Sequence, residues 1–328
     1  MTVAVPTLAA GDALAECLRS LESQTVTDFE VVVIDNSGRS LAQASGSRTR
    51  VIANKSNVGF GAAVNQALRE SQAPYLATLN DDAVARPDWL EALLRDAEAN
   101  PKTGMFASRV TMDDGRSLDS AGMLIASDGS SKQRGHGERT EIKFDAATLF
   151  PSGSAAMYRR AMLDEIGGFD EDFFLYCEDV DLGLRARWAG WECRYVASAI
   201  VEHRYSKSAG RASALKAYFV ERNRLYTIVK NFPGAMLIRA PFAAISRYLW
   251  HAVSLLEGRG KAAEFRKAGQ SSVLLPFLVF RAHCAALLHL LRLLKERRKI
   301  LGSRKISSRE FRELLRQHAI SARQVARL

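Results

Sequence analysis

The stretch Glu30-Val31-Val32-Val33-Ile34-Asp35-Asn36-Ser37 is the clearest predicted strand in this sequence, a β-branched run that ends in turn-forming residues. Three shorter apolar runs predict further strands, and segments with helical spacing separate them: strands at 3–7, 50–53 and 74–79, helices within 11–24, 54–67 and 89–97. Strands that alternate with helices in this way predict βαβ units, and therefore an α/β fold with a mostly parallel sheet.

Acidic residues follow two of these strands. Asp35 ends the first, and Asn80-Asp81-Asp82 follows the strand at 74–79. Ligands of open α/β sheets gather beyond the carboxyl ends of the strands, and Mg²⁺ is held by one or two carboxylates together with substrate phosphates. Asp81 and Asp82 are therefore candidates for a cation and sugar site, and Asp35 for contact with a nucleotide base. The alternatives are an Asn-Asp-Asp turn and an Asx-turn at Asp35.

A second informative stretch runs from Gly167 to Trp191. Two glycines and an aromatic-acidic loop lead into Glu178-Asp179-Val180-Asp181, which predicts a helix with three carboxylates in its first turn. Such carboxylates also suit the helix dipole, so an acidic helix start is the alternative. Together with Asp82 and the downstream His203, they suggest a metal and a general base in one cleft, although a lone histidine is often structural.

The remaining segments carry weaker signals. The loop at 56–61 lacks the Walker lysine but could present backbone N–H groups to a phosphate. Residues 112–149 predict a long polar excursion with possible short strands, followed by a strand near 151–158, a helix at 159–166 and a strand near 192–196. The basic-aromatic run 218–226 could pair with phosphates or form a solvated helix face.

Composition and charge bound the class of protein. The chain has 328 residues, 47% of them apolar and 25% charged, as in globular proteins. Its four cysteines are scattered and its N-terminus lacks a secretory pattern, so we expect reduced thiols and a cytoplasmic protein. Residues 204–328 hold 26 Lys/Arg against 6 Asp/Glu, whereas residues 1–203 hold 20 against 30. This split predicts a polyanionic partner for the C-terminal region.

The C-terminal region is apolar as well as basic. The runs 236–256 and 271–294 are interrupted by prolines and arginines, which favours helices lying on an anionic membrane surface over spanning helices. A helical subdomain that packs on the core or forms a homo-oligomer is the alternative. Residues 304–327 predict a basic terminal helix pair. We expect no nucleic-acid partner, since no nucleic-acid-binding motif is present.

Taken together, these segments resemble the bacterial inverting glycosyltransferases of family 2, particularly the rhamnosyltransferase-like branch. The resemblance covers about residues 3–231 and rests on motifs in this order: Val5-Pro6-Thr7, Val33 to Ser37, Ser56 to Gly61 with Asn65, Leu79 to Ala83, Gly153-Ser154-Ala155, Gly168 to Phe174, Glu178 to Asp181 with Arg185, His203, and Arg222-Asn223. It implies a GT-A fold, a nucleotide-diphosphate-sugar donor and a divalent cation, Mg²⁺ or Mn²⁺.

The resemblance also implies residue roles. Asp179, the second acid of the Glu178-Asp179 pair, would be the catalytic base, and Asp82 and His203 would ligate the metal. The donor would be bound by the following residues: Pro6, Thr7, Asp35, Asn57, Gly59, Asn65, Asp81 and Arg222. Two positions depart from the pattern, since Leu8 stands where many members have an aromatic residue and Asn80 begins the metal motif in place of an acid.

We therefore expect a catalytic domain at 1–231, with its nucleotide-sugar half at about 1–110 and its acceptor half at about 111–231. Residues 232–328 would form a helical region that associates with the membrane or oligomerises. The expected activity is transfer of a rhamnose-like deoxysugar from a dTDP- or UDP-sugar to a lipid-linked or polysaccharide acceptor at the inner face of the cell membrane, in cell-envelope glycan synthesis. The alternatives are another hexosyltransferase on this fold, or a non-catalytic protein that binds nucleotide sugars or membranes.

Overall fold

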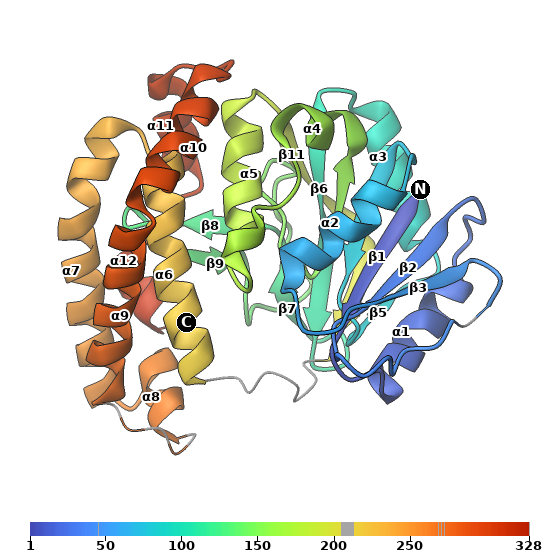
Figure 1. Cartoon of the computed structure of the whole chain (residues 1–328), viewed down its shortest axis with the longest axis horizontal. Coiled ribbons are helices and arrows are strands. Elements are labelled where there is room, and N and C mark those ends of the chain that lie inside the picture. The colour runs from blue at the N-terminus through green and yellow to red at the C-terminus, as the bar shows by residue number, and fades with distance from the viewer. Residues whose placement is uncertain (45, 205–212, 268, 270, 272, 328) are drawn as a thin grey trace. The chain divides into compact units, whose positions relative to one another are not determined.

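The computed structural model of the chain describes residues 1–44, 46–204, 213–267, 269, 271 and 273–327 (Figure 1). These residues fold into two compact units. Unit 1 comprises residues 1–123, 133–174 and 191–208, and unit 2 comprises residues 124–132, 175–190 and 209–328. The helix that carries Glu178 and Asp179 therefore belongs to the same unit as the C-terminal helices.

Unit 1 is built on a nine-stranded sheet in the order β3-β2-β1-β4-β10-β6-β11-β5, with β7 paired to β6. Its strands are β1 (Thr2–Thr7), β2 (Glu30–Asp35), β3 (Thr49–Ala53), β4 (Tyr75–Leu79), β5 (Ala83–Ala85), β6 (Thr103–Met112), β7 (Ser117–Ser120), β10 (Ala155–Arg159) and β11 (Glu192–His203). The four strands β3, β2, β1 and β4 are parallel, as the sequence predicts. β10 runs antiparallel to β4 and β6, and β11 returns parallel to β6.

Both faces of β1, β2 and β4 are buried, which explains why these strands read as continuous apolar runs, whereas the edge strand β3 is partly exposed. Val3 and Val5 of β1 and Val31 and Val33 of β2 pack in one core with α1 (Asp12–Glu22) and α3 (Trp89–Ala99). Ala4 and Val32 alternate with them and are also fully buried. In Figure 1, α2 (Phe60–Glu70) crosses in front of β1, and its small residues allow close approach to the sheet. The helix α4 (Arg160–Ile166) follows β10.

Several features of this sheet were not predicted, and the largest concern β6 and β11. The ten-residue strand β6 lies between β10 and β11, although its sequence Thr-Gly-Met-Phe-Ala-Ser-Arg-Val-Thr-Met has neither a β-branched run nor a clean alternation. The last strand, expected near 192–196, extends through a register shift as far as His203. Both strands depend on pairing partners far away in sequence, which overrides weak local propensity.

Unit 2 is mainly helical. Its elements are α5 (Glu178–Trp188), α6 (Ala214–Asn231), α7 (Gly234–Leu256), α8 (Gly260–Lys267), α9 (Leu274–Leu288), α10 (Leu290–Gly302), α11 (Ser308–Gln317) and α12 (Ala322–Arg327), and the short strands β8 (Met123–Ile125) and β9 (Ser131–Gln133) pair with each other. α5 is held by Trp188, which stacks on Phe311 and donates to the carbonyl of Asn231. No described helix is by itself both long and apolar enough to cross a bilayer, whereas α9 and α10 together meet that requirement by length and composition, across a 65° bend.

Candidate functional site

The carboxyl ends of adjacent parallel strands bring Thr7 and Asp81 together. Thr7 ends β1 and Asp81 follows β4, and the Thr7 hydroxyl donates to Asp81 Oδ2 at 2.6 Å. Burial raises the pKa of Asp81, and the neighbouring charge of Asp82 adds to the increase, although the hydrogen bond from Thr7 opposes it. The predicted Pro6, Thr7 and Asp81 thus lie at one sheet edge, where ligands of α/β sheets bind.

Asp82 and His203 lie next to each other, as their predicted shared role requires. His203 Nε2 is 3.1 Å from Asp82 Oδ1, and both side chains are 11% exposed. The pairing of β11 with β5 positions them, since His203 is in register with Ala83. Burial by itself lowers the pKa of His203, but hydrogen bonds to Asp119 and Asp82 outweigh it and raise the pKa to about 9.

The donor set of this pair fits a hard divalent cation. Asp82 Oδ1 and His203 Nε2 lie 3.1 Å apart, so both atoms would be close enough to hold one cation. In the part of the chain that the structure describes, no group of three or more His, Cys, Asp or Glu side chains is arranged to hold an ion by itself. Mg²⁺ commonly takes one or two carboxylates and completes its shell with water and substrate phosphates.

Asp119 was not predicted as part of this site. It lies on β7 with its side chain 3% exposed, and its Oδ2 is 3.1 Å from Nδ1 of His203. Asp119 Oδ1 also lies 3.1 Å from Nδ1 of His136. The sequence offered little signal for it, because Asp119 belongs to a four-residue strand inside the polar excursion. Its closeness to His203 arises only from the pairing of β6 with both β7 and β11.

Asp35 ends β2 and is fully buried. Its Oδ1 accepts from the Ser37 amide and its Oδ2 from the Ala42 amide, each at 2.8 Å. Burial by itself raises its pKa, but these hydrogen bonds and one from the Ser37 side chain lower it overall. The local turn that the sequence allowed is therefore present, and contact of Asp35 with a base remains a prediction.

The loop before α2 is shaped by Asn57 and Gly59. Asn57 Oδ1 accepts from the Gly59 amide at 2.9 Å, and Gly59 has a φ of +90°. A Cβ at this glycine would lie 2.3 Å from the carbonyl oxygen of Phe174, so only glycine fits here. The Phe60 amide donates to the same carbonyl at 2.9 Å. The start of α2 is thereby fixed against the end of the acidic loop.

Asn65, which was predicted to bind substrate, makes a dense set of contacts with that acidic loop. Its amide nitrogen donates to the carbonyl of Phe169 at 2.9 Å and to Glu171 at 3.0 Å, and its oxygen accepts from the Phe169 amide. Asn65 is also buried. In the structure, then, this side chain anchors the loop to α2.

Glu178 and Asp179 begin α5 after a loop with unusual backbone geometry. Phe174, Tyr176 and Cys177 all have positive φ values, of 62°, 68° and 64°. Such conformations cost about 1–3 kcal/mol each and concentrate at functional sites. The buried side chain of Asn223 on α6 donates to the carbonyls of Leu175 and Tyr176 at 2.8 and 2.7 Å, which holds this loop in place.

The two acids differ in environment. Glu178 is buried, and its burial together with the charge of Asp179 raises its pKa to about 8. Asp179 is partly exposed, and its Oδ1 accepts from the Val180 amide at 2.8 Å. Burial and the negative charge of Asp179 thus favour the protonated form of Glu178, and Asp179 is the more exposed of the two acids.

Arg222 lies on α6 among aromatic rings. Its guanidinium is 4.6 Å from the ring centre of Phe219 and 5.0 Å from that of Tyr226, and its Nε donates to Asn223 at 2.9 Å. The basic-aromatic run therefore forms a stacked cluster on one helix. Arg222 belongs to unit 2, whereas Thr7 and Asp81 belong to unit 1. The predicted contact of Arg222 with donor phosphate remains a prediction.

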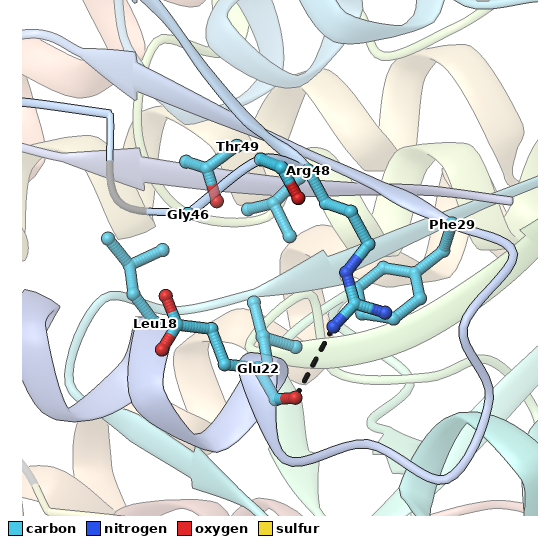
Figure 2. Close-up of a pocket in the computed structure, with 9 residues that line it drawn as sticks. Leu18, Glu22, Phe29, Gly46, Arg48 and Thr49 are labelled. Carbon is cyan, nitrogen blue, oxygen red and sulfur yellow. Dashed lines mark hydrogen bonds between the residues drawn. The ribbon is translucent and has the colours of Figure 1, made fainter.

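A cavity of about 160 Å³ lies elsewhere in unit 1. Figure 2 shows Leu18, Glu22 and Phe29 around it, and Arg48 donates to the Glu22 carbonyl at 3.3 Å. Phe29 precedes β2 and Thr49 begins β3, so the cavity lies at the amino ends of the strands. Thr7, Asp35 and Asp81 lie at the opposite ends, which separates this cavity from the candidate site.

Comparisons with known proteins agree with the family that the motifs suggested. A family model described as glycosyl transferase family 2 matches residues 2–167. An N-acetylglucosaminyl-diphospho-decaprenol L-rhamnosyltransferase of Mycobacterium tuberculosis is 31% identical over 249 residues, which is 66% of this chain and 81% of the relative. The O-antigen chain rhamnosyltransferase RfbN of Salmonella typhimurium is 26% identical, over 63% of this chain and 67% of its own length.

Solved structures share the fold at low sequence identity. S. aureus TarS 1–349 superposes with a TM-score of 0.51 at 18% identity, over 91% of both chains. The mannosyltransferase PcManGT of Pyrobaculum calidifontis, solved with GDP-Man and Mn²⁺, gives 0.51 at 16% identity, over 92% of this chain and 85% of that one. GalNAc-T7, solved with UDP, GalNAc and Mn²⁺, gives 0.58 at 12% identity, over 75% of this chain and 50% of that one.

Proposed function

Since this chain belongs to glycosyl transferase family 2, has the GT-A fold and is a glycosyltransferase, we propose that it is an inverting, cation-dependent enzyme that uses a nucleotide-diphosphate sugar. The observation that carries this proposal is the Asp82–His203 pair at the carboxyl end of the sheet, beside the Thr7–Asp81 contact. Asp82 and His203 would hold the cation, and Thr7, Asp35 and Asp81 would line the nucleotide and ribose pocket.

Asp179 would act as the general base. Its partly exposed carboxylate accepts the proton of the acceptor hydroxyl while that oxygen attacks the anomeric carbon. Attack on the face opposite the diphosphate inverts the configuration in one step. A divalent cation, when bound, supplies positive charge that offsets the charge developing on the leaving diphosphate. Glu178 is buried, so the more exposed Asp179 is the acid of this pair that we assign as the base.

The donor sugar we favour is rhamnose or a similar deoxysugar, carried by dTDP or UDP. The support is the similarity to two rhamnosyltransferases, one of which is named for a lipid-diphosphate acceptor. A lipid-linked or polysaccharide acceptor of the cell envelope follows from the same names. Another hexosyltransferase activity on this fold is the second candidate, because relatives at 26–31% identity leave room for a change of sugar.

Residues 1–231 would form the catalytic domain, and residues 232–328 would bring it to the inner, anionic face of the cell membrane. Support comes from α7, where Ile238, Phe242, Ile245, Leu249 and Leu256 are between 56% and 88% exposed. Their spacing of three, four or seven residues places them on one helix face. Exposed apolar side chains on a strongly basic helical region suit an interfacial helix. Self-association through this face is the alternative.

A donor-hydrolysis assay tests the central proposal. The protein is incubated with dTDP-rhamnose or a UDP-sugar in Mg²⁺ or Mn²⁺, and release of the nucleoside diphosphate is measured. We expect slow release that EDTA abolishes and added cation restores. Cation-dependent donor binding with no release, and no transfer to any acceptor offered, would instead favour a non-catalytic sugar-nucleotide-binding protein. Release that EDTA leaves unchanged would contradict the role of the cation.

A further inference from the structure

Asp119 and His203 are joined by the geometry of three strands. Asp119 lies on β7 and His203 at the end of β11, and both strands pair with β6. Asp119 Oδ2 is 3.1 Å from His203 Nδ1, and the other ring nitrogen, Nε2, is 3.1 Å from Asp82 Oδ1. Each ring nitrogen of His203 therefore contacts a different carboxylate.

We infer that Asp119 is a positioning residue, which holds the His203 imidazole in the orientation and tautomer that present Nε2 to the divalent cation. The inference rests on the proposed function, since it concerns the cation site of Asp82 and His203. A carboxylate that accepts from Nδ1–H keeps the proton on that nitrogen and leaves Nε2 as the ligand atom. It also makes the imidazole a more basic ligand.

Asp119 is itself well placed for this role. Its side chain is 3% exposed, so water hardly competes for its oxygens. His136 Nδ1 lies 3.1 Å from Asp119 Oδ1 and 3.2 Å from the Asp119 carbonyl oxygen, which fixes the carboxylate on the side away from His203. Because β7, β6 and β11 are hydrogen-bonded strands, the distance between Asp119 and His203 is set by the sheet and not by a loop.

A buried ion pair that only stabilises the fold would have the same contacts, so the test must measure the cation site directly. The probe is Mn²⁺ in the presence of excess UDP or dTDP, and bound Mn²⁺ is measured by electron paramagnetic resonance. The variants are Asp119→Asn, Asp82→Ala and His203→Ala. Asp96→Asn is the matched control, since Asp96 is a partly buried carboxylate of unit 1 that pairs with Arg194, near the start of β11, whereas His203 ends that strand.

We expect Asp119→Asn to weaken Mn²⁺ binding by about 10- to 100-fold, the usual range for loss of a partner that orients a metal ligand. Asp96→Asn should bind Mn²⁺ as the wild type does. The ¹⁴N coupling of a bound imidazole, seen in the wild type by electron spin echo measurements, should be lost in His203→Ala and diminished in Asp119→Asn. Wild-type binding and coupling in Asp119→Asn would overturn the positioning role.

The controls separate this inference from the function on which it rests. If Asp82→Ala and His203→Ala weaken Mn²⁺ binding but Asp119→Asn does not, the cation site stands and the role of Asp119 falls. If none of the three variants changes Mn²⁺ binding, the cation site itself is wrong. Should Asp119→Asn fail to fold, ¹⁵N-histidine NMR of the wild type with Mg²⁺ and UDP tests the role of Asp119 instead. The inference requires a protonated, hydrogen-bonded Nδ1 on His203. Protonation of Nε2 alone would overturn it.

Discussion

Of the three acids in the first turn of α5, Asp179 is the most exposed, and the loop before this helix has unusual backbone geometry. Tyr176 and Cys177 have positive φ values immediately before Glu178 and Asp179. Asn223 stabilises that geometry from α6 by two hydrogen bonds to loop carbonyls. At the scale of single residues, the proposed reaction would therefore depend on the Asp179 carboxylate and on the Asn223 side chain, which holds the loop before it.

We expect Asp179→Asn to reduce kcat by at least about 100-fold, since loss of a general base typically removes a factor of about 10² to 10⁴. Donor affinity, measured by calorimetry, should change little, because the asparagine keeps the shape of the side chain. Asp164→Asn is the control, since Asp164 is an exposed carboxylate that pairs with Arg160. Full turnover in Asp179→Asn would remove Asp179 from the role of base.

We expect Asn223→Ala to lower both stability and turnover. Two loop carbonyls lose their donor, and a buried polar group without a partner costs about 1–3 kcal/mol. The free energy of unfolding in urea should fall by about 2 kcal/mol, and kcat should fall more than the KM for the donor changes. Asn100→Ala, which removes an amide bonded to the carbonyl of Asp96, serves as the control for loss of an asparagine. Equal effects of the two variants on kcat would contradict a role for the loop.

At the scale of elements, α5 is held in unit 2 by a buried set of charges. Asp181 is fully buried, and its two oxygens lie 2.8 Å from Lys230 Nζ and from Arg185 Nε. Asn231 donates to the same carboxylate at 2.9 Å. Burial by itself raises the pKa of Asp181, but the charges of Lys230 and Arg185 outweigh it and hold the pKa well below its ordinary value.

This depressed pKa gives a prediction about acid stability. The folded-state pKa of Asp181 lies below its unfolded value near 3.8. The ionised carboxylate therefore contributes fully to the free energy of unfolding above that pH, and this contribution is lost as the pH falls further. We expect Asp181→Asn to lower the free energy of unfolding by about 3–5 kcal/mol at pH 7, since it leaves buried cations unpaired. The difference from the wild type should shrink below about pH 4.

Urea unfolding at a series of pH values measures this effect. Glu313→Gln is the control, because its ion pair with Arg316 is exposed and should be worth less than about 1 kcal/mol. If the difference in free energy of unfolding between wild type and Asp181→Asn stays constant from pH 7 to pH 3, ionisation of Asp181 does not stabilise the fold.

At the scale of the whole molecule, the excess of positive charge and the exposed apolar residues of α7 lie in the same part of the sequence. Residues 204–328 carry an excess of about 20 positive charges, and the exposed apolar face of α7 lies within them. Arg247 interrupts the α7 sequence but is buried, 2.7 Å from Glu221 and close to Asp128, so it does not break that face. Large exposed apolar patches commonly mark interaction sites, and the positive charge of this region is the reason we propose anionic lipid as the partner.

Liposome flotation tests this prediction. We expect the full chain to float with vesicles containing phosphatidylglycerol and much less with phosphatidylcholine vesicles, and added salt should weaken the binding. Phe242→Glu combined with Ile245→Glu should reduce binding at least about tenfold, since each buried side chain is worth about 1.5–3 kcal/mol. Ile142→Glu, at an exposed apolar position of unit 1, is the control. If the chain does not float with the vesicles and these substitutions convert an oligomer into monomers, that result would favour self-association through this face.

The sequence by itself determined the parallel half of the sheet and the positions of the acids that follow its strands. Residues such as Val31 and Val33 predict a strand through local preference and burial, and Asp35 and Asp81 come at strand ends because turn residues end the runs. These are properties of neighbours in the chain, so a linear pattern can carry them. The motifs also indicated the family, which the comparisons confirmed.

Only the tertiary structure decided how distant segments meet. β6 has no strong strand signal, yet it holds β7, β10 and β11 together and thereby places Asp119 beside His203. Asn65, for which the family resemblance implied a donor contact, anchors a loop in the structure, and that donor contact stays a prediction. Asp181, predicted as a helix-start acid, neutralises buried cations. The reason is physical, since long-range strand pairing and burial depend on partners about 50 to 100 residues away, and a local pattern carries no record of them.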